Sequence, residues 1–84
     1  MYEIIFARSA RKDLQKLSNL DINRILKKIE MLEFDPRPPG CEKLKGESNL
    51  WRIRVGNFRV IYTVSDKNKV IDISLIRHRR EAYK

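Results

Sequence analysis

Residues 51–62 read WRIRVGNFRVIY, two short runs of alternating side chains on either side of a Gly-Asn pair. Such alternation is typical of strands with one buried face, and a two-residue loop that begins with glycine suits a type II′ hairpin turn. With the Gly-Asn pair in the turn, Arg54 lies directly opposite Arg59. A slip of one residue would turn arginines into the core, so the sequence predicts this register for strands over 50–55 and 58–64.

The predicted register divides the hairpin into two faces. One face is apolar and belongs under the helices, together with side chains of a third strand over 69–76; the set is Trp51, Ile53, Val55, Phe58, Val60, Tyr62, Ile71, Ile73 and Leu75. The other face carries Arg52, Arg54 and Arg59, and we expect it to be exposed. Because like charges directly across two strands are destabilising, this cluster favours a bound phosphate, which suits the planar guanidinium fork. The alternative is a solvated face whose guanidinium groups stay apart.

The rest of the chain predicts one more strand and two helices. Residues 2–7 are rich in aromatic and β-branched side chains and predict a strand, after which Ser9 can cap a helix that ends near residue 17. Residues 19–32 carry the clearest amphipathic pattern and predict a second helix, antiparallel to the first. A loop with three prolines then leads into the hairpin. We expect an α+β fold in a single domain over 1–84: a β-strand, a helical hairpin, then an antiparallel β-meander with two helices packed on one face of the sheet.

Composition and charge exclude several classes of protein. The 84 residues carry 19 Lys and Arg against 11 Asp and Glu, a net charge of +8. No apolar run reaches the roughly 20 residues of a membrane span, and the start is too short and too charged for a signal peptide. A lone Cys41 and a lone His78 predict neither a disulfide nor a zinc site. We expect a cytoplasmic protein without metal or cofactor, whose charge favours nucleic acid first, an acidic protein second and a membrane least. A merely soluble basic surface is the alternative.

Residues 77–84 read RHRREAYK and form a basic C-terminal segment with an aromatic residue near its end. A meander brings the end of the last strand beside its neighbour, so this segment can lie next to the arginine face. Arginines beside an aromatic ring make a surface of the kind used on single-stranded RNA. A solvated tail is the alternative reading.

Residues 51–62 and 76–83, taken together, resemble the RelE family of prokaryotic toxins, whose relative ParE shares the fold and much of the first motif. The resemblance implies a toxin of a type II toxin–antitoxin system. It implies a ribosome-dependent endoribonuclease that cuts mRNA in the A site without metal, by attack of a 2′-hydroxyl on the next phosphate. The alternatives are a ParE-like poison of DNA gyrase and a nucleic-acid-binding module without catalysis.

The resemblance also implies roles for individual residues. Arg59 and Arg79 match arginines that stabilise the phosphate, and Tyr83 matches a terminal tyrosine that acts as a base or as a stacking platform. Well-characterised members have lysines at the positions of Arg52 and Arg54, where arginine keeps the charge but cannot exchange a proton.

The residues themselves add three candidates. His78 is an acid–base candidate because its ordinary pKa lies near neutrality; a structural histidine is the alternative. Arg77 and Arg80 join Arg52 and Arg54 as candidate RNA-binding residues.

The resemblance implies as partners the ribosome, its mRNA and a RelB-like antitoxin, in a complex that can be a heterotetramer, and no membrane. The charge of +8 predicts an acidic toxin-binding segment in that antitoxin, with apolar anchors that slow dissociation. We expect it to land on the outer faces of the two helices and on the sheet beside the arginines.

Overall fold

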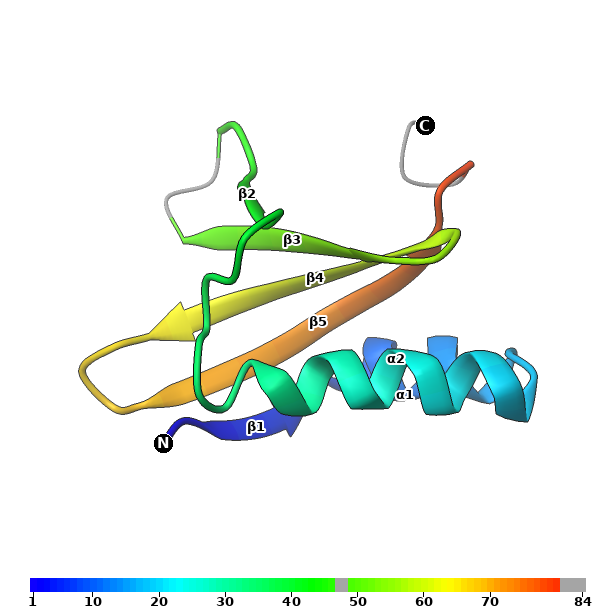
Figure 1. The fold of residues 1–84 in the computed structure, drawn as a ribbon, viewed down its shortest axis with the longest axis horizontal. Coiled ribbons are helices and arrows are strands. Elements are labelled where there is room, and N and C mark those ends of the chain that lie inside the picture. The colour runs from blue at the N-terminus through cyan, green and yellow to red at the C-terminus, as the bar shows by residue number, and fades with distance from the viewer. Residues whose placement is uncertain (47–48, 81–84) are drawn as a thin grey trace.

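The computed structural model describes residues 1–46 and 49–80, which form two helices on one side of a sheet (Figure 1). In chain order the elements are β1 (Glu3–Phe6), α1 (Arg8–Gln15), α2 (Asn19–Met31), β2 (Glu42–Lys43), β3 (Leu50–Val55), β4 (Phe58–Ser65) and β5 (Val70–His78). The fold therefore follows the expected order of a strand, two helices and a meander. In the described part of the chain, neither helix is long and apolar enough to cross a membrane.

The hairpin of β3 and β4 has the predicted register. Val55 pairs with Phe58 and Arg54 pairs with Arg59, around a turn in which Gly56 has φ 59°. A side chain is strained at such an angle, so glycine suits this position of the turn. The strand order is β1-β5-β4-β3-β2, and all neighbours are antiparallel except β1 and β5. The parallel pairing of β1 makes the sheet mixed, which the sequence did not predict.

The helices differ from expectation at one end. Ser9 does not cap α1: the helix begins at Arg8, its N-cap residue is Ala7 without a side-chain bond, and the Ser9 hydroxyl donates to the carbonyl of Ser74 at 2.6 Å. The second helix is capped by Ser18, whose hydroxyl accepts from the backbone N–H of Asp21. Ser9 therefore serves tertiary structure rather than helix capping.

The core lies between the sheet and the two helices. It is built from Ala10, Ile25, Ile29, Leu32, Ile53, Val55, Val60, Tyr62, Val64, Ile71, Ile73 and Ile76. The prediction that Leu75 joins this layer was wrong. Ile61 pairs with Leu75 but Tyr62 pairs with Ile73, so β5 carries an extra residue at this point. Such a bulge shifts the alternation by one position, and Ile76 rather than Leu75 is buried.

Tyr62 is the largest fully buried side chain, and its hydroxyl donates to the carbonyl of Pro36 at 2.7 Å. Burial raises the pKa of the Tyr62 phenol well above its ordinary value near 10. Because this group stays protonated in the folded state, its contribution to stability is complete below pH 10 and is lost as the pH rises further. We expect Tyr62→Phe to lower the free energy of unfolding by about 1 kcal/mol at pH 7.

Above pH 10 the free energy of unfolding should fall less steeply with pH in Tyr62→Phe than in the parent chain. Urea titrations at pH 7 and at alkaline pH measure this difference. Tyr2→Phe is the matched control, because the Tyr2 hydroxyl donates to Asp66 at the exposed surface. An alkaline slope in Tyr62→Phe as steep as in the parent chain would contradict this assignment.

Candidate functional site

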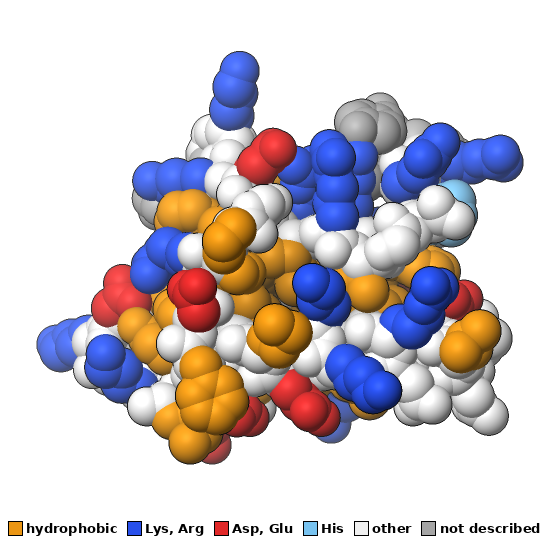
Figure 2. Space-filling view, viewed as in Figure 1, with side chains coloured by type: hydrophobic (Ala, Val, Ile, Leu, Met, Phe, Trp, Pro, Cys, Tyr) orange, Lys and Arg blue, Asp and Glu red, His pale blue; other side chains and the backbone are white. Residues whose placement is uncertain are grey.

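Three arginines from neighbouring strands lie in one cross-strand row. Arg54 of β3 pairs with Arg59 of β4, and Arg59 pairs in turn with Arg77 of β5. Figure 2 shows Lys and Arg side chains gathered above β3 and at the end of β5, with the histidine beside them. The cross-strand pair inferred from the sequence is therefore part of a wider basic surface.

A pocket of about 420 Å³ opens beside Arg54 and Arg59, close to the turn of the β3–β4 hairpin. Arg54, Phe58, Arg59, Arg79 and Gly56 line it. The backbone N–H of Arg79 donates to the carbonyl of Asn57 at 2.7 Å, which fixes the segment after β5 against the turn of the β3–β4 hairpin. We call this space the arginine pocket. It brings together three of the predicted site residues, Arg54, Arg59 and Arg79, from three parts of the chain.

The expectation that the whole arginine face is exposed was wrong for two of its members. Arg52 and Arg59 are each only 7% exposed, whereas Arg54 is exposed. The short strand β2 pairs with β3 at the edge of the sheet, and the Arg52 guanidinium forms an ion pair with Glu42, its cross-strand partner. Arg59 lies on the central strand, between the arginines of both neighbouring strands. Buried guanidinium groups are held in place, which suits a preorganised anion site.

Arg77 does not line the arginine pocket. Its guanidinium forms an ion pair with Asp13 of α1, and the same carboxylate accepts the backbone N–H of Ile76 at 2.9 Å. The row of arginines thus divides: Arg54 and Arg59 face the pocket, and Arg77 is held by the first helix.

His78 packs away from the arginine pocket. Its ring lies edge-on to Phe58 with 5.4 Å between the ring centroids, and it lines two pockets on the helix side of the hairpin. Nδ1 accepts the backbone N–H of Arg80 at 3.3 Å. The side chain of Arg80 is exposed, and Tyr83 lies outside the described residues.

The arginine pocket can bind an anion through fixed, permanently charged donors. Guanidinium groups remain protonated at any pH a protein tolerates and match two oxygens of a phosphate at once. Within residues 1–46 and 49–80, no three His, Cys, Asp or Glu side chains are grouped so that they could hold a metal ion. The guanidinium donors of the arginine pocket suit the binding of a phosphate and the stabilisation of charge that develops on it.

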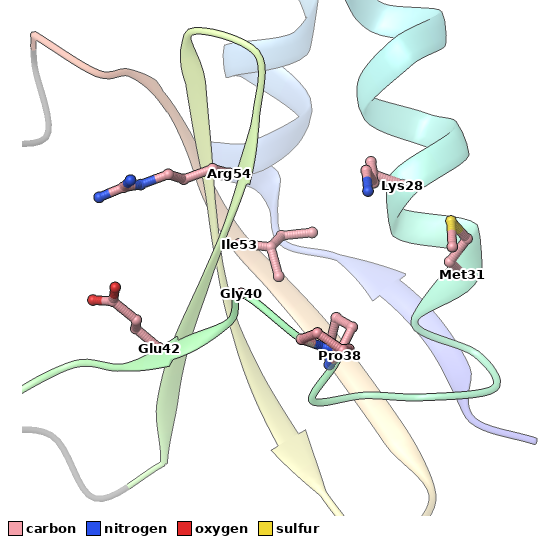
Figure 3. Close-up of a pocket in the computed structure, with 8 residues that line it drawn as sticks. Lys28, Met31, Pro38, Gly40, Glu42, Ile53 and Arg54 are labelled. Atoms are coloured by element: carbon pink, nitrogen blue, oxygen red, sulfur yellow. The ribbon is translucent and has the colours of Figure 1, made fainter.

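A second surface runs between α2 and β3. A pocket of about 350 Å³ lies there between Lys28 and Met31 of the helix, Pro38 of the proline loop and Ile53 of β3. Figure 3 shows Ile53 pointing toward the helix, while Arg54 points to the other side of the sheet, where Glu42 also lies. A neighbouring pocket shares the two helical residues and adds others along α2, so the hollow continues toward the Gly56 turn. We call this hollow the α2–β3 groove.

Residues 4–83 match the model of a protein family described as the ParE toxin of the type II toxin–antitoxin system parDE. The chain belongs to the RelE/ParE toxin family. It is 36% identical over 76 residues to RelE1 of Methanocaldococcus jannaschii, a protein named as a candidate toxin, and the match covers 87% of this chain and 84% of that one.

Solved structures agree with this membership. RelE in the archaeal RelE–RelB complex from Pyrococcus horikoshii OT3 is 35% identical, with a TM-score of 0.82 over 93% of this chain and 94% of that one. The intact RelBE toxin–antitoxin complex of E. coli contains a chain that is 25% identical, with a TM-score of 0.80 over 93% and 96% of the two chains. The protein is a toxin of a type II toxin–antitoxin system, with the α+β fold of RelE.

The sequence analysis did not predict that two acidic residues of this RelE/ParE toxin pair with its arginines. Glu42 pairs with Arg52 through β2, a strand of two residues that is too short to show alternation. Asp13 was detectable in principle, since it follows Ala10 by three residues on the apolar stripe of α1, where a carboxylate is out of place. Each of them forms an ion pair with one arginine of the toxin, Glu42 with Arg52 and Asp13 with Arg77.

Proposed function

We propose that this toxin is a ribosome-dependent endoribonuclease that cuts mRNA in the A site and so halts translation in the cytoplasm. The observation that carries the proposal is the arginine pocket, in which Arg54, Arg59 and Arg79 meet within a volume of about 420 Å³. Three permanent cations around one pocket suit a phosphate that gains charge during reaction. The relatedness to RelE proteins supports the same reading.

The proposed reaction is an attack by a 2′-hydroxyl of the mRNA on the adjacent phosphate. The 2′-oxygen forms a bond to phosphorus and loses its proton to a base, while the bond from phosphorus to the 5′-oxygen breaks and that oxygen gains a proton. The products are a 2′,3′-cyclic phosphate and a 5′-hydroxyl end. In this scheme Arg59 and Arg79 stabilise the non-bridging oxygens, and Arg52, Arg54, Arg77 and Arg80 attract the RNA backbone.

Two side chains are proposed for proton transfer. Tyr83 is proposed as the base or as a stacking platform for a nucleobase, and His78 as an acid that acts through Nε2. Arg52 and Arg54 stand where well-characterised family members have lysines, and no strong base stands out among the candidate residues. The ribosome is therefore expected to position the substrate, and free RNA should be cut slowly.

The test is a cleavage assay with purified toxin, ribosomes programmed with a defined mRNA, and the same mRNA alone. The proposal expects cuts within the A-site codon in the programmed ribosome, with cyclic-phosphate ends. Mapping of mRNA 5′ ends after brief induction is the matching experiment in cells. Intact mRNA together with DNA damage would instead indicate a gyrase poison, and RNA binding without cuts would indicate a binding module.

The two roles of Tyr83 make different predictions for two substitutions. Tyr83→Ala removes the ring and the hydroxyl and should slow cleavage by about tenfold or more under either role, because stacking alone contributes about 1–3 kcal/mol. Tyr83→Phe keeps the ring and slows the reaction only if the hydroxyl is the base. Cleavage by Tyr83→Ala at the rate of the unmodified toxin would remove Tyr83 from the mechanism.

We propose further that a RelB-like antitoxin binds the α2–β3 groove. Met31 is 59% exposed there, and the adjoining face of α2 carries Arg24, Lys27 and Lys28. An acidic segment with apolar anchors would match both the charge and the exposed apolar surface. RelE–RelB complexes among the solved relatives support a partner of this kind.

The antitoxin complex should survive 1 M salt, where the Debye length is about 3 Å, because apolar contacts rather than charge limit its dissociation. Lys28→Glu should weaken the complex about tenfold at low salt, mainly through slower association. Lys67→Glu, an equal charge change in the exposed turn between β4 and β5, is the control. Calorimetry measures the affinity of the toxin for the antitoxin. Light scattering measures the stoichiometry of the complex and tests whether it is a heterotetramer. Complete dissociation in 1 M salt would contradict the role of the apolar anchors.

A further inference from the structure

The edge of β5 changes its hydrogen-bonding partner half-way along its length. Up to Ile73 it pairs with β1, and the backbone N–H of Ala7 donates to the Ile73 carbonyl as the last bond of this ladder. Beyond that point side chains of α1 take over: the Ser9 hydroxyl donates to Ser74 O, and Asp13 Oδ2 accepts from Ile76 N. The helix therefore satisfies backbone groups that would otherwise need another strand.

Asp13 makes more contacts with the edge of β5 than Ser9 does. The residue is only 8% exposed, and its Oδ2 atom both accepts the backbone N–H of Ile76 and pairs with the guanidinium of Arg77. A carboxylate on the buried side of a helix is unfavourable unless such partners satisfy it. Its two partners lie at the end of β5, immediately before the segment that carries Arg79.

The segment after Ile76 has a second anchor three residues further along. Arg79 N donates to Asn57 O, so the chain between Asp13's contact and the hairpin turn is held at both ends. The side chain of Arg79 enters the arginine pocket from this held segment, whereas the side chain of Arg77 is held outside it. Asp13 thus holds the chain directly before Arg79 and keeps the Arg77 guanidinium paired outside the pocket.

We infer that Asp13 is a positioning residue, which fixes the end of β5 so that Arg79 lies in the arginine pocket and Arg77 stays out of it. The inference about cleavage rests on the proposed function, but the inference about position does not. Since β4 still pairs with the other edge of β5 as far as His78, loss of the carboxylate should loosen the outer edge and the segment that follows it. Displacement of a phosphate-binding group by about 1 Å can slow a reaction by about 10²-fold.

The test compares Asp13→Ala, Asp13→Asn and a control, Glu30→Gln, which removes an exposed charge from α2. The first readout is amide hydrogen exchange in the toxin alone. Asp13→Ala should speed exchange at Ile76 and Arg79 by at least about tenfold, relative to core amides of β4. Asp13→Asn keeps an acceptor for Ile76 and should show a smaller change, and it serves if the alanine variant does not fold.

The second readout is cleavage on programmed ribosomes. Asp13→Ala should lower kcat by about 10- to 100-fold with little change in KM, since binding residues remain. Asp13→Asn should cleave faster than Asp13→Ala, and Glu30→Gln should cleave at the rate of the parent toxin. Unchanged exchange at Arg79, or full kcat in a folded Asp13→Ala toxin, would overturn the inference. A parent toxin that does not cleave would overturn the proposed function instead, and the exchange data would still decide the role of Asp13.

Discussion

Arg59→Ala is expected to lower the rate of single-turnover cleavage on programmed ribosomes by about 10²- to 10³-fold, the effect of removing one preorganised donor from a charge-stabilising site. Arg59 lies on the central strand and is 7% exposed, so the fold rather than the substrate determines where its guanidinium lies. A fixed cation needs no reorganisation as the phosphate gains charge. Induction of this variant should therefore leave growth unaffected.

Two further variants separate geometry from charge and from folding. Arg59→Lys keeps the charge without the planar fork, and we expect a loss of about tenfold. Arg11→Ala removes the same charge from the exposed face of α1 and should cleave normally. Because Arg59 is buried, circular dichroism and the urea midpoint must show that each variant is folded before its rate is interpreted. Full toxicity of a folded Arg59→Ala variant would remove Arg59 from the mechanism.

The sequence predicted the parts of this fold that depend on local pattern. The Gly-Asn turn and the alternation around it fixed a register that places Arg54 opposite Arg59, as the structure confirms. Pairing over long distances in the chain was not predictable in this way. The parallel contact of β1 with β5 depends on how the helical hairpin returns the chain, and no periodicity within Glu3–Phe6 encodes it.

The errors have physical causes in single residues. An extra residue in β5 moved Ile76 into the core in place of Leu75, and a single sequence carries no mark of such a bulge. Alternation also says which face a side chain is on, but not what covers that face. Arg52 was assigned correctly to the face away from the helices, yet it is buried, and its guanidinium pairs with Glu42 of β2.

For the candidate site, the sequence predicted which residues belong to the basic surface better than it predicted where their side chains lie. The motifs predicted Arg54, Arg59 and Arg79 as site residues, and the structure brings these three side chains to one pocket. Arg77 and His78 were grouped with them because they are neighbours in sequence. In the structure Arg77 pairs with Asp13 and His78 packs on Phe58. Successive residues of a strand point to opposite sides, and α1 rather than a strand lies along that edge of β5.

Arg79→Ala is expected to lower kcat by about 10²-fold while leaving stability within about 0.5 kcal/mol of the parent, because its side chain is exposed. The hydrogen bond from Arg79 N to Asn57 O involves the backbone and survives the substitution. The variant thus removes the guanidinium from the arginine pocket without releasing the segment that carried it. This distinguishes Arg79→Ala from Asp13→Ala, which keeps the guanidinium and releases the segment.

Arg80→Ala is the matched comparison, since it removes the same charge one residue further along from a side chain that does not line the arginine pocket. Attraction of the RNA backbone depends on the number of cations and not on their exact placement. Either variant should therefore make the slope of the logarithm of the RNA-binding constant against the logarithm of the salt concentration less steep by about 0.7. Only Arg79→Ala should also lower kcat, whereas Arg80→Ala should raise KM alone. Equal losses of kcat in the two variants would mean that the segment acts through bulk charge, and the arginine pocket would then not be the place where the phosphate reacts.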